Sequence, residues 1–195
     1  MSNEIGAALY LLQLLVTSPR TGGLMALLVI AAITDVKTGR IPNWLVFGGA
    51  AFGLLYNSLF PLFPRDIGIL VALGGLGVGL VAMLPLYALR AMGAGDVKLM
   101  AMVGAFLGTS ATVGAVLATL ITGGVLAVAL TLWSGSVVRM SRNVAMMFRG
   151  TMLTIATGVG GLATHDGPSA GKMPYGVAIA VGTIAYLVLT QLGLI

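Results

Sequence analysis

The sequence predicts an all-α fold, a polytopic integral membrane bundle of about six transmembrane helices. Of its 195 residues, 58% are hydrophobic and 8% are charged, whereas an ordinary soluble domain has about 25% charged residues. Long apolar stretches recur along the whole chain, separated by turns rich in Gly and Pro. Because these stretches leave little room for a separate soluble domain, residues 1–195 are expected to form a single domain.

The expected spans follow from the apolar runs and from the Pro and Gly residues that interrupt them. Residues 1–20 are instead expected to form an interfacial or partly inserted helix, because the apolar run at residues 5–16 has only about 12 residues. Whether that run crosses the membrane stays open. The six spans are predicted at residues 21–35, 42–60, 66–89, 96–107, 111–133 and 174–192. The fourth span is short because residues 108–110 predict a turn.

Residues 136–172 are expected to form a cytoplasmic amphipathic segment followed by a loop. At about 100° per residue, apolar side chains of this segment fall on one arc and Arg139, Arg142 and Arg149 fall on the opposite arc. This pattern is typical of a helix in the membrane interface, with anionic lipid headgroups as partners of the arginines. His165 and Asp166 are assigned to a surface loop, since a lone histidine lacks a second ligand for a metal.

Glycine is abundant, and several glycines are spaced four residues apart. The pairs Gly49/Gly53, Gly75/Gly79 and Gly104/Gly108 have the small-xxx-small spacing that lets helices approach closely. We expect these pairs to pack helices within the bundle rather than to form a dimer interface. A homo-oligomer stays open as an oligomeric state.

The distribution of Lys and Arg indicates how the bundle is oriented. If the first span ends on the inside, Arg20 and Arg65 are the two cations left outside. The eight on the cytoplasmic side are Lys37, Arg40, Arg90, Lys98, Arg139, Arg142, Arg149 and Lys172. This excess follows the positive-inside rule.

Charge and cysteine content exclude several function classes. The net charge is +5, from 10 Lys and Arg and 5 Asp and Glu, and so few cations cannot build the dense basic surface that nucleic acid requires. The chain has no cysteine, which excludes disulfides, thiolate zinc sites, iron–sulfur clusters and cysteine nucleophiles. No metal and no other cofactor is expected, and membrane lipids are the expected surroundings.

Two of the five acidic residues carry the functional interpretation. Asp35 and Asp96 each lie at the inner membrane boundary, where an ionisable side chain is costly and by default marks a functional site. They share one depth on one side of the membrane, so a bundle can bring them together. Two neighbouring carboxyls do not both ionise easily, so one keeps a proton while the other acts as a base, as in the water-activating pair of aspartic proteases.

Position alone leaves other functions open for these aspartates. A helix–helix hydrogen bond or a proton relay would also place an acid in a span, and the relay defines the alternative function, a small proton-coupled transporter. A transporter favours ionisable groups near the bilayer midplane and an inverted repeat. Here both acids are expected near one rim, and no repeat is visible.

The residues around the two aspartates resemble the signature motifs of a known family. Asp35 stands in TDVKTGRIPN and Asp96 in GAGDVKLM, and both motifs are similar to those of the prepilin peptidases, or type IV leader peptidases. KMPYG at 172–176 is similar to the start of the family's last span. The resemblance implies a Gly-x-Gly-Asp intramembrane aspartyl protease that cleaves the leader peptide from type IV prepilin or pseudopilin precursors, with Asp35 and Asp96 as the catalytic pair.

The resemblance also implies a location and further site residues. It implies the bacterial inner membrane, with the active site facing the cytoplasm and a role in type IV pilus assembly and protein secretion. Gly93 and Gly95 are expected to permit unusual backbone angles and a close approach of the substrate backbone to Asp96. Lys98 and Pro174 are expected to contact substrate, although Lys98 has fixing the topology as its alternative role.

The chain departs from the larger members of the family. Those members carry an N-terminal cytosolic domain with paired Cys-x-x-Cys motifs and also methylate the new N-terminus of the product. This chain has no cysteine and no room for such a domain before the first span. It is therefore expected to be the short, peptidase-only kind that serves Flp or tight-adherence pili, without N-methylation.

Overall fold

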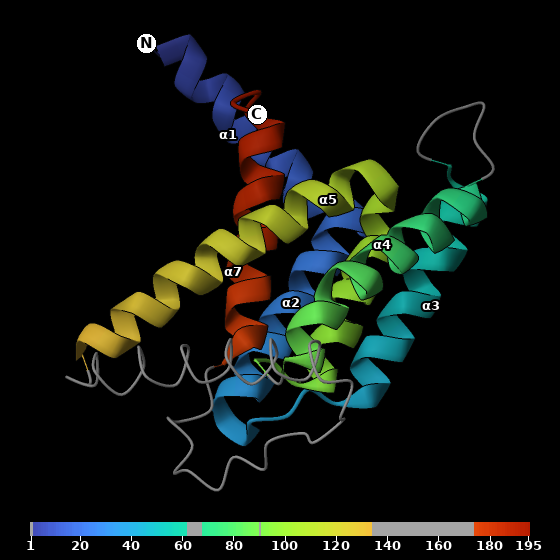
Figure 1. Cartoon of the computed structure of the whole chain (residues 1–195). Coiled ribbons are helices and arrows are strands. Elements are labelled where there is room, and N and C mark those ends of the chain that lie inside the picture. The colour runs from blue at the N-terminus through green and yellow to red at the C-terminus, as the bar shows by residue number, and fades with distance from the viewer. Residues whose placement is uncertain (1, 62–67, 90, 134–173) are drawn as a thin grey trace, which may run out of the picture. The chain divides into compact units, whose positions relative to one another are not determined.

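A computed structural model of the chain describes residues 2–61, 68–89, 91–133 and 174–195 (Figure 1). Every element in these residues is an α-helix, which confirms the predicted all-α class. The helices are α1 (Ser2–Thr17), α2 (Pro19–Thr38), α3 (Asn43–Leu59), α4 (Gly68–Ala88), α5 (Ala94–Trp133) and α7 (Tyr175–Gln191). The segment predicted at residues 136–172, with His165 and Asp166, lies outside the described residues.

The chain divides into two compact units, residues 1–123 with 174–195, and residues 124–173. The second unit is described only over residues 124–133, the last part of α5. The packing and the site described below belong to the first unit. All residues named below for the packing and the site are described residues of this first unit.

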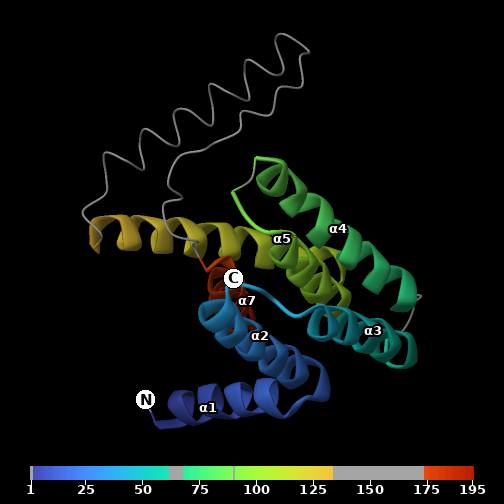
Figure 2. The ribbon, with the colours of Figure 1, turned by 90° about the horizontal axis from the view of Figure 1, so that it is seen from below.

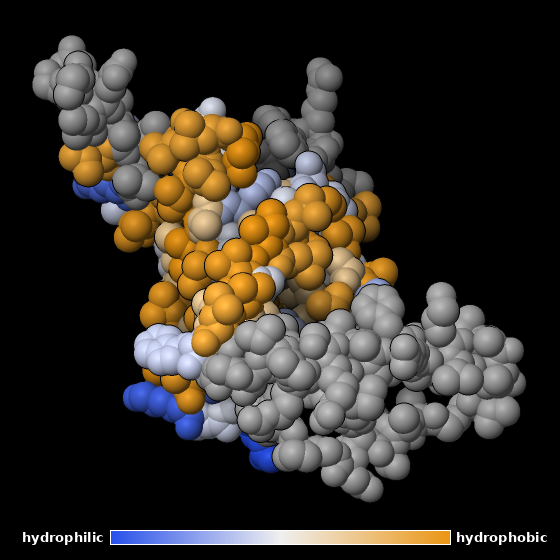
Figure 3. Space-filling model, turned by 60° about the vertical axis from the view of Figure 1, so that its left-hand side comes forward, coloured by the Kyte–Doolittle hydropathy of each residue, from blue (hydrophilic) through white to orange (hydrophobic). Residues whose placement is uncertain are grey.

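Long apolar helices with exposed apolar side chains confirm a helical membrane protein. Three stretches of the described residues, Pro19–Thr38, Gly68–Ala88 and Ala94–Leu130, are long and apolar enough to span a bilayer. The helices α3 and α7 have 17 residues each, and the total of about six spans stays a prediction. Large apolar side chains are exposed on all of these helices, and they cover most of the described surface in Figure 3. Lipid is the solvent that accepts such a surface.

The predicted short fourth span is the central helix of the unit. Gly108 breaks α5 with φ 77° and ψ 177°, a left-handed backbone angle that glycine adopts without steric cost. The helix continues after this one residue, so the turn expected over residues 108–110 is a kink at Gly108. Every residue from Leu99 to Gly108 is buried, which is typical of a helix surrounded on all sides.

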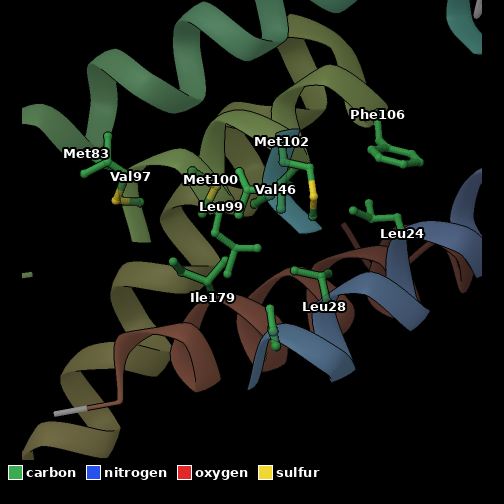
Figure 4. Packing of buried hydrophobic residues seen from close by; sticks show 14 of the residues in the cluster. Leu24, Leu28, Val46, Met83, Val97, Leu99, Met100, Met102, Phe106 and Ile179 are labelled. Carbon is green, nitrogen blue, oxygen red and sulfur yellow. The ribbon is translucent and has the colours of Figure 1, made fainter. Parts of the chain in front are cut away.

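The surrounding helices supply the rest of the hydrophobic core. Figure 4 shows side chains from four helices around the first half of α5, including Leu28 of α2, Val46 of α3, Met83 of α4 and Ile179 of α7. In Figure 2 that half of α5 lies between α4 on one side and α2 and α3 on the other. The helix α1 packs against α2 and α7, and its insertion into the membrane stays a prediction.

Glycine pairs bring the neighbouring helices against the first half of α5, which confirms their predicted role in packing. A Cβ atom on Gly104 would overlap the backbone of Gly75, and one on Gly75 would overlap the backbone of Gly104 and Gly108. On α3, a Cβ atom on Gly53 would lie 3.2 Å from the Ala105 carbonyl oxygen. These contacts lie within one chain, so backbone approaches backbone across two faces of the central helix.

Two polar side chains bind carbonyl groups of α5 just before the kink at Gly108. Asn57 of α3 donates from Nδ2 to the carbonyl oxygens of Ala105, at 2.7 Å, and Phe106, at 3.3 Å. Arg20, in the first turn of α2, donates from Nε to the Phe106 carbonyl at 2.7 Å. Buried carbonyls need such partners, and a cation near a helix C-terminus is also favoured by the helix dipole. Arg20 was predicted only as a cation outside the membrane, and its hydrogen bond to the Phe106 carbonyl is a structural role that this prediction did not include.

Replacing Gly104 with Ala is expected to lower the thermal stability of the protein. The new methyl group would meet the Gly75 backbone, which cannot rotate away, and overpacking of this kind costs about 1–3 kcal/mol. Gly77→Ala on α4 is the matched control, because no heavy atom lies within 4 Å of a Cβ there. Thermal unfolding in detergent measures both variants, and equal melting temperatures would contradict the packing account.

Candidate active site

Asp96 is held in the first turn of α5 by its own helix start. Its Oδ2 atom accepts a hydrogen bond from the Gly93 N–H at 2.9 Å, and its N–H donates to the Gly93 carbonyl at 3.1 Å. Gly93 directly precedes the helix, so the side chain three residues into the helix reaches back to the capping residue, as in a capping box. Asp96 is 8% exposed, and these bonds give the buried carboxyl one defined orientation.

Asp35 is held by a different helix. It lies in the last turns of α2 and is half-buried, and its Oδ2 atom accepts a hydrogen bond from the Gly176 N–H at 2.8 Å. Gly176 is the second residue of α7, whose capping residue Pro174 makes no side-chain cap hydrogen bond. Asp35 therefore supplies a cap for α7 from 141 residues away in the sequence.

The structure brings Asp35 and Asp96 together. The two carboxyls lie close enough for the negative charge of Asp35 to act on Asp96, and the charge of Asp96 acts in turn on Tyr175, beside Gly176. Within the described residues, no hydrogen bond joins the carboxyls, and only the Oδ2 atom of each is bonded to the protein. Each aspartate thus uses one oxygen to support the fold, and its other oxygen has no hydrogen-bond partner among the described residues.

Such a pair is suited to acid–base catalysis on a water molecule. One ionised carboxyl can take a proton from water while its protonated neighbour donates a proton to a carbonyl oxygen. No group of three or more His, Cys, Asp or Glu side chains that could hold a metal occurs in the part of the chain that the structure describes.

The expectation that Gly93 and Gly95 adopt unusual backbone angles is wrong. Among the described glycines, positive φ angles occur at Gly39, Gly108 and Gly193, so the backbone at residues 93 and 95 does not need glycine for its conformation. A Cβ atom would lie 3.4 Å from Asp96 Oδ2 at position 93 and 3.4 Å from Ile41 Cβ at position 95. Both distances are ordinary contacts. The predicted approach of substrate to these glycines stays a prediction.

The other two predicted substrate-contacting residues serve the fold in this structure. Lys98 donates from Nζ to Asn43 Oδ1 at 3.2 Å and lies over the Phe47 ring, 5.3 Å from its centroid, which connects α5 to α3. Pro174 caps α7, and its carbonyl oxygen accepts the Val177 N–H at 3.1 Å. Their contact with substrate stays a prediction.

Sequence reasoning missed Tyr175 and Gly176 as residues of the site. Both belong to the KMPYG stretch at 172–176, which was noted only for its likeness to a family motif. That likeness was the available signal, because no periodicity or spacing relates a helix start to an aspartate so distant in the sequence.

The fold and the site together define a class of protein, a polytopic membrane protein with a close pair of carboxyls at the helix ends. A model of the type IV leader peptidase family matches residues 23–128, a range that contains both aspartates. The chain belongs to the type IV leader peptidase family and is therefore an aspartic peptidase with a prepilin peptidase function. No curated protein and no solved structure matches the chain.

Asp96→Ala is expected to unfold at a lower temperature than Asp96→Asn. The amide oxygen of Asn can still accept the Gly93 N–H, whereas Ala leaves this donor without its partner, and loss of such a cap costs about 1 kcal/mol. Both variants remove the charge, so their comparison isolates the cap. Thermal unfolding in detergent is the measurement, and equal stability of the two variants would show that the cap is unimportant.

Proposed function

We propose that Asp35 and Asp96 are the catalytic pair, and that the enzyme cleaves the leader peptide from Flp-type prepilin precursors at the cytoplasmic face of the inner membrane. The observation that carries this proposal is the pairing of the two carboxyls, each held by a backbone N–H through one oxygen, with Asp96 within reach of the charge of Asp35. Membership of the peptidase family favours this reaction over the transporter alternative.

In the proposed reaction a water molecule lies between the two carboxyls. The ionised aspartate removes a proton from the water, whose oxygen attacks the carbonyl carbon of the scissile peptide bond. The second aspartate donates its proton to the carbonyl oxygen, and proton transfer to the amide nitrogen then releases the mature N-terminus. Fixing each carboxyl through Oδ2 reduces the reorganisation that this sequence requires.

The charge distribution supports a cytoplasmic active site. Asp35 and Asp96 lie near the C-terminal end of α2 and the N-terminal end of α5. Lys37, Arg40 and Lys98 are at these same helix ends, and the positive-inside rule puts such cations in the cytoplasm. A leader cleaved there would be cut before the pilin leaves the membrane.

The absence of cysteine from this sequence supports cleavage without methylation and an Flp-type substrate. The paired Cys-x-x-Cys motifs of the larger, methylating kind cannot be built from it. The proposed partners are thus a prepilin precursor and the surrounding lipid, and the proposed product has a free amino terminus.

Asp35→Asn and Asp96→Asn are each expected to reduce precursor cleavage by about 10²–10⁴-fold, because Asn keeps the shape of the side chain but cannot exchange the proton. Cleavage is measured by the appearance of the shortened pilin after co-expression, with enzyme in the membrane quantified in parallel. Glu4→Gln on α1 is the control for loss of an acidic group. Normal processing by either Asn variant would remove that aspartate from the mechanism.

The mature pilin made by this enzyme alone is expected to carry an unmodified N-terminus. Mass spectrometry of pilin from a host lacking other leader peptidases distinguishes a free amine from a methylated one. A mass increase of one methyl group on the terminal residue would contradict the peptidase-only proposal while leaving the cleavage activity intact.

A further inference from the structure

The start of α7 makes a contact with Asp35 that goes beyond the pair of carboxyls. The N–H groups in the first turn of a helix have no partner within the helix, and here the Gly176 N–H binds Asp35 Oδ2 at 2.8 Å. Pro174, at the capping position, has no side-chain group that does this. One hydrogen bond therefore gives a first-turn N–H group of α7 a partner and orients the carboxyl of Asp35.

Gly176 also provides the space in which the Asp35 side chain lies. A Cβ atom at position 176 would be 2.8 Å from Asp35 Oδ2, 3.0 Å from its Cβ and 3.1 Å from its Cγ. Gly176 is itself buried, and on α2 the preceding turn is fixed in the core by Leu28 and Ala31, both 0% exposed. Because the helices pack against each other there, the carboxyl of Asp35 would have to rotate away, while its Cβ can move only with the backbone of α2.

We propose that Gly176 is the positioning residue for Asp35 in the catalytic pair, a role that rests on the proposed function. Its N–H fixes Oδ2, its missing side chain admits the carboxyl, and the second oxygen of Asp35 is left for the reaction. Tyr175, the preceding residue, is under the influence of the Asp96 charge, so one turn of α7 lies beside both aspartates. The residues matched by the family model end at 128, well before this turn.

The test is the Gly176→Ala variant with two glycine controls. We expect kcat for precursor cleavage to fall about 100-fold, the effect of moving a reacting group by about 1 Å, with KM unchanged because the rest of the substrate contacts are kept. Gly48→Ala is the neutral control, since nothing lies within 4 Å of a Cβ there. Gly182→Ala, on α7, would press on Thr119 Cα at 2.6 Å, so it should lower the melting temperature while the folded enzyme keeps its kcat.

A double-mutant cycle with Asp35→Ala separates positioning from packing. Ala at position 35 lacks Oδ2 and Cγ, two of the three atoms that a Cβ at 176 would approach. Gly176→Ala should therefore lower the melting temperature less in the Asp35→Ala background than in the wild type. If Gly176→Ala alone does not accumulate, recovery of accumulation in the D35A/G176A protein supports the proposal, and failure to recover overturns it.

The outcomes distinguish this proposal from the proposed function. Full activity of Gly176→Ala, alongside inactive Asp35→Asn, would overturn the positioning role and leave the catalytic pair in place. A rise in KM with kcat retained would also overturn it, because it would make this turn of α7 a substrate contact. Normal cleavage by Asp35→Asn would overturn the catalytic pair, while the melting temperatures of the cycle would still report on the contact.

Discussion

The described unit depends on pairing the backbone groups that helix ends leave without partners inside a hydrophobic core. A buried N–H or carbonyl without a hydrogen bond is costly, and hydrocarbon outside the protein offers no substitute. The first half of α5 has backbone groups bound by side chains at both ends: the N–H of Gly93 just before its start, and the carbonyls of Ala105 and Phe106 just before its kink. The Asp96 carboxylate accepts the Gly93 N–H, and Asn57 and Arg20 donate to the two carbonyls.

Close packing at glycine residues brings these backbone groups within hydrogen-bond distance of the side chains that bind them. The first half of α5 can be central because Gly75 and Gly104 let α4 approach its backbone on one side and Gly53 lets α3 approach it on another. Asn57, one turn beyond Gly53, then reaches the Ala105 carbonyl. The same close approach that buries the helix therefore also satisfies its polar ends, so packing and hydrogen bonding favour one arrangement.

Each of the two aspartates supports the fold and, in the proposed function, also takes part in the reaction. Each caps a helix with Oδ2, which makes its orientation a property of the fold. Each is also a carboxyl withdrawn at least partly from solvent, and the two lie close together. In the proposed enzyme this combination is useful, because general acid–base catalysis requires an acid that is held in place and can still exchange a proton.

Much of the fold could be predicted from the sequence because apolar runs and their interruptions are local features. The ends of α2, α3, α4 and α7 lie close to the predicted spans, and Gly108 was identified as the point where α5 breaks, although as a turn. Asp35 and Asp96 could be proposed as a pair from their shared depth and their motifs. The expected backbone angles at Gly93 and Gly95 were wrong, since a glycine in a motif does not reveal whether its conformation or its size is required.

The sequence by itself determined the helical membrane class, the breaks between helices and the two acidic positions, because hydropathy and turn-forming residues act over short distances. Tertiary structure alone decided which helix starts and ends those polar side chains would serve. Nothing local to Arg20 indicates that it binds the Phe106 carbonyl, and nothing near Asp35 indicates the N–H of Gly176. Such contacts arise only when packing brings distant segments together, and a hydrogen bond depends on a few tenths of an ångström that no sequence pattern encodes.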